Sequence, residues 1–198
     1  MVDEHGGRGE RNFPNGFFDR VSTAVAPDLL GCELVDGSCR GRIVEVEAYL
    51  GADDAASHAY RGPTKRNAVM FGRSGHLYVY FTYGMHWCAN VVTGPLNVGQ
   101  AVLIRAVEPI DGVDVMRERR VRVRRDTDLT NGPAKLCEAF AITGTDNGAD
   151  LLTGPLRIVS RRAELDPGLI GCSPRIGISK AVDAPWRWFI VASAYLSR

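Results

Sequence analysis

The clearest alternation of aromatic and β-branched residues lies in the middle of the chain, in the stretch HLYVYFTYGMHWCANVV. Leu77–Thr82 has the residue types of a strand, and His86–Val92 resumes them after a short break, so the stretch predicts a β-hairpin. A turn that faces water usually carries Asn, Asp or Gly among polar residues. Tyr83 and Met85 at this tip therefore indicate an apolar wedge, with packing on a neighbouring loop as the alternative.

A second alternating segment, RGRIVEVEA, covers Arg40–Ala48. It follows Cys32–Val35 across an Asp36-Gly37 turn, which predicts another pair of strands. Because strand side chains repeat every two residues, Glu45 and Glu47 share one face of their strand. A solvated face and a pair of functional carboxylates both remain open from this pattern alone.

Apolar runs predict the remaining elements. We expect a helix after Ser22 as N-cap, a helix that begins after Asp111, a helix over Ala134–Ile142, and strands over Ala101–Val107, Leu156–Val159, Arg175–Ile178 and Arg187–Val191. The first of these strands carries a single charge, Arg105, and an unpaired guanidinium in such a run would be very costly. Its partner is predicted to be Glu45 or Glu47 on an adjacent strand, or Glu108 nearby.

The segment after the second strand is unusual for a loop, because it combines acidic, aromatic and imidazole groups. Asp53, Asp54 and His58 fall within a dozen residues of Glu47. Loops of this kind often carry function on a scaffold formed elsewhere. Four basic residues follow, which fits either phosphate contacts or a solvated surface: Arg61, Lys65, Arg66 and Arg73.

Length and composition narrow the class of protein. The 198 residues predict one domain over 13–198 and a disordered tail over 1–12. With 24 Lys+Arg against 23 Asp+Glu, net charge does not indicate a nucleic-acid partner, so the placement of arginines must. The 5 cysteines form no CxxC pair, which favours reduced thiols and an intracellular protein without a zinc site. No run approaches the ~20 apolar residues of a membrane span.

Several sequence blocks together resemble one enzyme family. They are RGRIVEVEAYLG, DDAASHAYRGPTKRN, MFGRSGHLYVYFTYGMHWCANVV, AVLIRAVEP, NGPAKLC and RIGISKAVDAPWRW, whereas no GxGxxG, GxxxxGK[ST], HExxH or GxSxG motif is present. The chain resembles the alkyladenine (3-methyladenine) DNA glycosylase family from about Phe17 to the C-terminus. The resemblance implies a monofunctional repair enzyme that flips alkylated or deaminated purines out of duplex DNA and hydrolyses their N-glycosidic bond.

The resemblance also implies a fold and a set of roles. The fold is a compact single-domain α/β mixed (α+β) fold with a curved, mostly antiparallel sheet, flanking helices and a protruding hairpin. Glu47 matches the general base and Arg105 its partner in holding the attacking water. Tyr49 on one side, with His58 and Tyr80 on the other, match the residues that sandwich the flipped base. Asn90 matches the residue beside the purine edge. Tyr83 matches the residue that intercalates into the duplex, and Met85 lies beside it.

The expected partner is double-stranded DNA with damaged purines. We expect a monomer in the cytoplasm or at the nucleoid that uses no metal and no other cofactor. Two other classes of function remain in competition. One is a metal-dependent nuclease with ligands from Glu45, Glu47, Asp53, Asp54 and His58, since Mg²⁺ sites use carboxylates and substrate phosphates. The other is a non-catalytic module that recognises distorted DNA through Tyr83 and the arginines.

Overall fold

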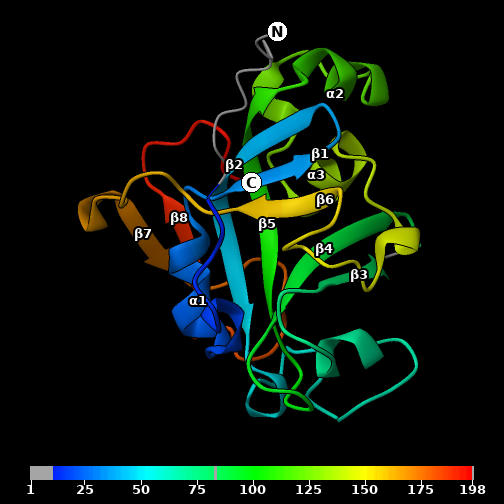
Figure 1. The fold of residues 1–198 in the computed structure, drawn as a ribbon, viewed down its shortest axis with the longest axis vertical. Helices are drawn as coiled ribbons and strands as arrows, with labels where there is room; N and C mark the ends of the chain where they lie inside the picture. The colour runs from blue at the N-terminus through cyan, green and yellow to red at the C-terminus, as the bar shows by residue number, and fades with distance from the viewer. Residues whose placement is uncertain (1–10, 83, 198) are drawn as a thin grey trace, which may run out of the picture.

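The centre of the molecule is a twisted sheet, which the computed structural model describes within residues 11–82 and 84–197. In this part of the chain 8 strands form the sheet, in the order β3-β4-β5-β2-β1-β6, with β8 pairing with β2 and β7 pairing with β8 (Figure 1). The strands are β1 Glu33–Asp36, β2 Cys39–Tyr49, β3 Leu77–Thr82, β4 His86–Thr93, β5 Gln100–Asp111, β6 Leu156–Val159, β7 Ile170–Ser173 and β8 Arg187–Ile190. Their pairings are antiparallel, which confirms the predicted mixed α/β class.

Three α-helices lie against this sheet among the described residues: α1 Ser22–Leu29, α2 Val113–Arg119 and α3 Pro133–Ala139. Helix α1 packs on β2 and β5, whereas α3 packs on β4, β5 and α2. Short 3-10 helices complete the chain: η1 Phe17–Asp19, η2 Gly51–Asp53, η3 Ala68–Phe71, η4 Asp126–Asp128, η5 Gly144–Asp146 and η6 Pro167–Leu169. No helix in the described ranges has the length and apolar character to cross a bilayer.

The two-residue period of the strands separates the hydrophobic core from a polar face. Val46 and Ala48 of β2 and Ile104 of β5 are fully buried in the main core. The intervening residues Glu47 and Arg105 point to the opposite face, because successive strand side chains alternate. The same alternation therefore places apolar side chains in the core on one face of the sheet and the charged side chains of Glu47 and Arg105 on the other face.

Strand pairing brings residues from distant parts of the sequence into one row across the polar face. Tyr78 lies opposite Asn90, and Asn90 lies opposite Leu103. Leu103 in turn lies opposite Glu47, which pairs with Arg187 of β8. Five strands thus contribute to a single line of side chains.

The predicted hairpin is confirmed as β3 and β4, which form one edge of the main sheet. Its turn is closed by Met85, whose backbone amide donates to the carbonyl oxygen of Thr82 at 3.1 Å. Gly84 adopts a φ of 67°, a conformation that glycine accommodates readily. Met85 is 69% exposed, as a wedge requires. Tyr83 lies outside the described residues.

The prediction of Ser22 as an N-cap is wrong, because α1 begins at Ser22 itself. The Ser22 side chain is buried and its hydroxyl makes no hydrogen bond. Its backbone amide is instead satisfied by Oε1 of Gln100, at 2.9 Å. A cap from a residue 78 positions away cannot be read from local sequence.

Two other predictions at the C-terminal half need correction. Residues 175–178 form no strand but an irregular loop, and the strand in this region is β7, which pairs with β8. The predicted helix over residues 134–142 is shorter, since α3 ends at Ala139. Helix α2 begins where predicted and ends at Arg119, so the arginines that follow, Arg120, Arg122, Arg124 and Arg125, are not part of an α-helix.

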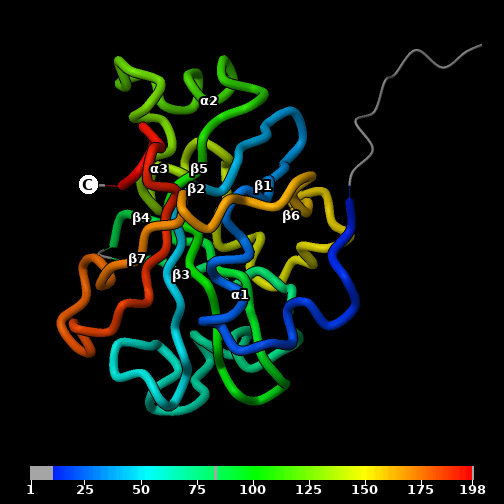
Figure 2. Tube along the Cα trace, turned by 90° about the vertical axis from the view of Figure 1, so that its left-hand side faces the viewer, coloured from blue at the N-terminus to red at the C-terminus, as the bar shows by residue number. Residues whose placement is uncertain are grey.

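The predicted disordered tail falls mostly on residues 1–10, which lie outside the described residues. Arg11 is already held, since its Nη1 donates to the carbonyl oxygen of Arg162 at 2.8 Å. All five cysteines are unpaired thiols, and only Cys172 among them is exposed. The tube in Figure 2 shows that the loop after β7 (orange) lies beside the loop after β2 (cyan), although the two are far apart in sequence.

Candidate active site

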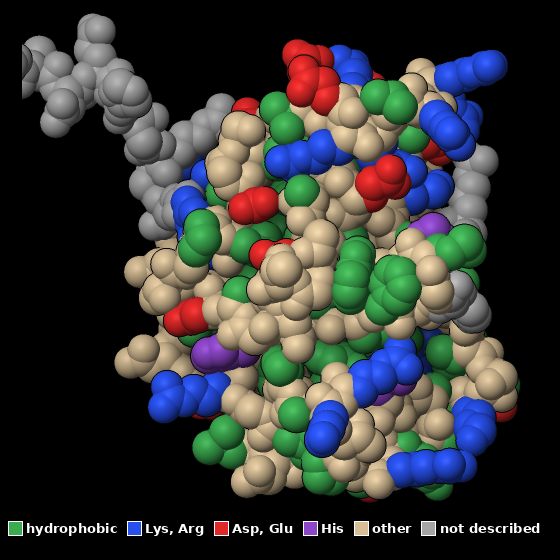
Figure 3. Space-filling model, turned by 90° about the vertical axis from the view of Figure 1, so that its right-hand side faces the viewer, with side chains coloured by type: hydrophobic (Ala, Val, Ile, Leu, Met, Phe, Trp, Pro, Cys, Tyr) green, Lys and Arg blue, Asp and Glu red, His purple; other side chains and the backbone are tan. Residues whose placement is uncertain are grey.

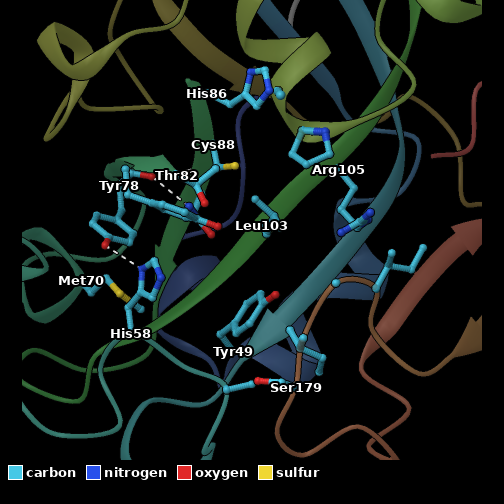
Figure 4. A pocket seen from close by; sticks show the side chains of 18 of the residues that line it. Tyr49, His58, Met70, Tyr78, Thr82, His86, Cys88, Leu103, Arg105 and Ser179 are labelled. Carbon is cyan, nitrogen blue, oxygen red and sulfur yellow. Dashed lines mark hydrogen bonds between the residues drawn. The ribbon is translucent and has the colours of Figure 1, made fainter. Parts of the chain in front are cut away.

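A cavity of about 520 Å³ opens on the polar face of the sheet. This volume is within the usual range of small-molecule sites. The walls include Tyr49, His58, Tyr78, Tyr80, Cys88, Asn90, Arg105 and the loop residues 176–180. Figure 4 shows His58 and Tyr78 on one side of the cavity and Arg105 on the other, with Tyr49 between them at the lower edge. The predicted base-binding residues are therefore brought together around one space.

Three rings form the wall that faces Tyr49. The His58 and Tyr80 ring centroids are 4.4 Å apart with an angle of 77° between the planes. Tyr78 stacks on Tyr80 at 5.7 Å, and its hydroxyl lies 3.0 Å from Nδ1 of His58. These mutual contacts fix the orientation of each ring before any ligand enters, which lowers the entropy cost of binding.

The pKa shifts of His58, Tyr78, Tyr80 and Tyr49 all favour the uncharged form of these rings. Burial, aided by the nearby charge of Arg66, lowers the pKa of His58. Burial raises the pKa of Tyr78 to about 12. The pKa values of Tyr80 and Tyr49 are also raised, in both cases chiefly by burial. A cavity lined by uncharged, electron-rich rings attracts a cationic aromatic ligand through cation–π interactions.

Glu47 is fully buried, and three residues of the cavity wall bind its carboxylate: Tyr49 and Ile176 by hydrogen bonds and Arg105 by an ion pair. Its Oε1 accepts from the backbone amide of Ile176 at 2.8 Å and forms an ion pair with Arg105 Nη1 at 3.0 Å. Its Oε2 accepts from the hydroxyl of Tyr49 at 2.9 Å. An ionised carboxylate offers about four acceptor positions, so Oε2 retains one for a further donor such as water.

Arg105 joins Glu47 to the neighbouring Glu45 in one buried ionic cluster. Its Nε donates to Glu45 Oε1 at 2.8 Å, and Arg187 Nε donates to the same oxygen at 2.8 Å. Burial acts to lower the pKa of Arg105, but the charges of Glu47 and Glu45 outweigh it and raise that pKa. The predicted pairing with the two strand glutamates is thus observed. The alternative partner, Glu108, pairs with Arg42.

The surroundings of Glu45 indicate a structural role, because hydrogen-bond donors enclose its carboxylate. Burial acts to raise its pKa, but hydrogen bonds from Arg187 and Ser197 and the charge of Arg105 lower it overall. Both Ser197 groups contribute, the amide at 2.6 Å to Oε2 and the hydroxyl at 2.6 Å to Oε1. The C-terminal segment therefore closes over Glu45, whereas Glu47 accepts from the Tyr49 hydroxyl and the Ile176 amide, which belong to two residues of the cavity wall.

Asn90 lines the cavity and is 3% exposed. Its Nδ2 donates to the carbonyl oxygen of Tyr78 at 3.1 Å, across the β3–β4 pair. This bond fixes the amide plane, so Asn90 presents a rigid polar group to whatever occupies the cavity.

Comparison with known proteins decides the family. A family model described as methylpurine-DNA glycosylase (MPG) matches residues 16–194. This chain belongs to that family. A protein of Burkholderia lata named "Putative 3-methyladenine DNA glycosylase" is 52% identical, with 93% of this chain and 90% of that protein aligned. One of the same name from Methanoculleus marisnigri is 50% identical, with 93% and 98% covered.

Membership in the methylpurine-DNA glycosylase family makes the chain a DNA-repair enzyme, a hydrolase that acts on N-glycosyl bonds in DNA containing damaged bases. It confirms the predicted resemblance. The geometry also weighs against the rival nuclease. The carboxylates of Glu45, Glu47 and Asp54 are each engaged by a guanidinium. Among the residues that the structure describes, no group of three His, Cys, Asp or Glu side chains is arranged around a common point for a metal ion.

Sequence reasoning overlooked three contributors to this glycosylase cavity. Tyr78 could have been found, because it lies two residues before Tyr80 and so shares its strand face. Ile176 contributes only a backbone amide, which carries no signal in its side chain. Arg175, beside it, is fully buried in an ion pair with Asp54. Arg175 belongs to the block RIGISKAVDAPWRW, which contributes to the family resemblance, but the resemblance assigned no role to Arg175.

Part of the molecular surface is rich in basic side chains. Figure 3 shows Lys and Arg side chains in both halves of one face, with Asp and Glu mostly in the upper half, so that the lower part is mainly basic. The loop between β2 and β3 fills the lower part of the molecule in Figure 1 and carries exposed Arg61, Lys65, Arg66 and Arg73. The arrangement suits contact with phosphates, since the balanced net charge conceals a local excess of cations.

Proposed function

We propose that this glycosylase flips an alkylated or deaminated purine out of duplex DNA and binds it between Tyr49 and the His58–Tyr80 wall. The substrates are of the 3-methyladenine, 7-methylguanine, hypoxanthine and ethenoadenine class. The observation that carries the proposal is the buried Glu47, whose carboxylate is bound by three residues that line an aromatic cavity: Tyr49, Ile176 and Arg105. A planar base fits such a cavity, and rings on both sides replace the stacking lost on leaving the duplex.

In the chemical step, Glu47 accepts a proton from a water molecule as the water oxygen bonds to C1′ of the flipped nucleotide. The N-glycosidic bond breaks, its electron pair leaves with the base, and an abasic site remains. Arg105 keeps the carboxylate in place and helps to hold the water. The Tyr49 hydroxyl retains its proton, because burial and the charge of Glu47 raise its pKa, so it acts as a donor to Glu47.

Selection of damaged bases follows from the neutral cage. A purine methylated at N3 or N7 carries a positive charge, and electron-rich rings favour it by about 1–2 kcal/mol over a neutral purine in a desolvated site. Neutral His58 adds no repulsion to such a base. The rigid amide of Asn90 crowds the purine edge and discriminates against unmodified guanine.

The hairpin tip opens the duplex in this proposal. Met85 is exposed at the turn, and it enters the stack with Tyr83 to fill the space that the base vacates. Such wedges offset an unstacking cost of a few kcal/mol. The exposed arginines of the β2–β3 loop contact phosphates. We infer further that residues 13–198 act as one glycosylase domain, since residues from Tyr49 to Lys180 line one cavity, and that the protein acts as a monomer at the nucleoid.

The proposal predicts a specific product pattern. A duplex with one hypoxanthine should be cut only after alkali treatment, because glycosylase action leaves an abasic site with an intact backbone. Excess EDTA should not reduce the yield, since the water is activated by Glu47. The measurement is a denaturing gel with and without alkali. A direct break that needs Mg²⁺ would identify a nuclease, and binding without any break across alkylated and deaminated lesions would identify a recognition module.

A further inference from the structure

Arg175 is a buried cation to which the proposed chemistry gives no role. Its side chain is 0% exposed, and its Nη1 and Nη2 donate to both carboxylate oxygens of Asp54, at 2.6 and 2.9 Å. Nη1 also donates to the carbonyl oxygen of Ala48 at 3.0 Å. Buried ion pairs are weak evidence for stability, because apolar replacements are often as stable. Stability alone therefore does not explain why a cation is buried at Arg175.

The guanidinium also lies between two rings. Its centre is 4.6 Å from the Tyr49 ring centroid and 5.0 Å from that of Trp186. One face of Tyr49 is thus covered by Arg175. The ring cannot rotate without breaking this contact and the bond from its hydroxyl to Glu47.

Both carboxylate oxygens of Glu47 receive a donor that Arg175 holds in place. The Tyr49 hydroxyl, under the guanidinium, donates to Oε2 at 2.9 Å. The backbone amide of Ile176, the next residue along the chain, donates to Oε1 at 2.8 Å. Residues 174–180 have no regular secondary structure, so strand pairing does not fix this amide. Instead, the neighbouring Arg175 side chain, which is anchored on Asp54, fixes the position of this amide.

We propose that Arg175 is a positioning residue for catalysis, which orients the Glu47 carboxylate through Tyr49 and the Ile176 amide. Asp54 gives the anchor its rigidity, since it also accepts from the backbone amides of Leu50 and Ala56 at 3.3 and 3.0 Å. The Arg175–Asp54 ion pair joins the loop after β2 to the loop after β7, which lie side by side in Figure 2. The inference rests on the proposed role of Glu47 as the base.

The test uses Arg175→Lys, which keeps the charge but loses the two-pronged bond and the flat stacked surface. Single-turnover excision at saturating enzyme should fall by about 10- to 100-fold, the scale of a misplacement near 1 Å. Affinity for undamaged duplex should change by less than about threefold, because phosphate contacts supply most non-specific binding. Asp54→Asn should act in the same direction, and it carries the test if Arg175→Lys does not fold.

A double-mutant cycle separates positioning from general loss of structure. In a Glu47→Gln background, Arg175→Lys should cost less than about threefold further, because residues that act as a unit are strongly non-additive. Arg161→Lys is the matched control. Arg161 likewise donates to backbone carbonyls, of Asp28 and Leu30, and pairs with Glu164, but none of these partners lines the cavity. It should retain the wild-type rate.

Two results would overturn the inference: a folded Arg175→Lys protein with a wild-type rate, or an equal loss in both backgrounds. These are distinct from a failure of the proposed function. If Glu47→Gln alone kept the wild-type rate, the assignment of the base would fail. If Glu47→Gln were inactive and Arg175→Lys fully active, only the positioning role would fail.

Discussion

Glu47→Gln should lower single-turnover excision of hypoxanthine by about 10²–10⁴-fold, the usual worth of a positioned general base. Gln keeps the shape of the side chain: its amide oxygen can still accept from the Ile176 amide, and its amide nitrogen can donate to the Tyr49 hydroxyl. It cannot take a proton from water. Affinity for lesion-containing duplex should be retained, because the carboxylate is buried behind the cavity wall. Alkylated purines should be less sensitive than hypoxanthine, since a positively charged base is already a good leaving group.

Glu45→Gln is the matched control, because both glutamates share one strand face, full burial and a bond to Arg105. It should change the rate much less, and act mainly on stability through Arg187 and Ser197. Single-turnover gels and thermal denaturation of both proteins supply the comparison. Equal inactivity of two equally well folded variants would require a shared carboxylate pair in place of a single base.

Arg105→Met should have the largest effect on stability, a loss of about 3–5 kcal/mol, as found when one partner of a buried ionic group is removed. The change leaves Glu45 and Glu47 facing each other with one cation, Arg187, in hydrogen-bond contact with Glu45. Excision should also be lost, because Glu47 loses its ion-pair partner at 3.0 Å. Chemical denaturation measures the free energy of unfolding, and the gel assay measures activity.

The control for this prediction is Arg42→Met, which removes a salt bridge with Glu108 at the surface. The Arg42 side chain is 44% exposed, and exposed ion pairs usually contribute less than about 1 kcal/mol. If Arg105→Met proved as stable as Arg42→Met, the buried cluster would not be held by charge pairing as described.

The elements that sequence predicted well are those with strong local patterns. The β3–β4 hairpin and the β1–β2 pair follow from alternation and from turn residues, and both occur as expected. The pairing of Arg105 with Glu45 and Glu47 followed from a single physical requirement, that a charge in an apolar run needs a partner. Family resemblance then supplied the assignment of roles, which spacing alone had left open.

The features that sequence missed depend on contacts between distant residues. The cap of α1 comes from Gln100, and the clamp on Tyr49 comes from Arg175. The Ile176 amide serves Glu47 from 129 positions away, and no side-chain type reports such a bond. A run such as Arg175–Ile178 has β-branched residues, but it folds as a loop because its polar groups bind the site instead of a neighbouring strand.

Entry of the damaged base into the cavity is tested most directly by a crystal structure of the Glu47→Gln protein bound to a duplex with one ethenoadenine. The slow variant keeps the base attached to its sugar. The expected result is a base outside the helix, between Tyr49 and the rings of His58 and Tyr80, with C1′ facing residue 47 and the hairpin tip at Met85 in the vacated stack. A base that remains stacked in the duplex, or that lies outside this cavity, would contradict the proposed mechanism.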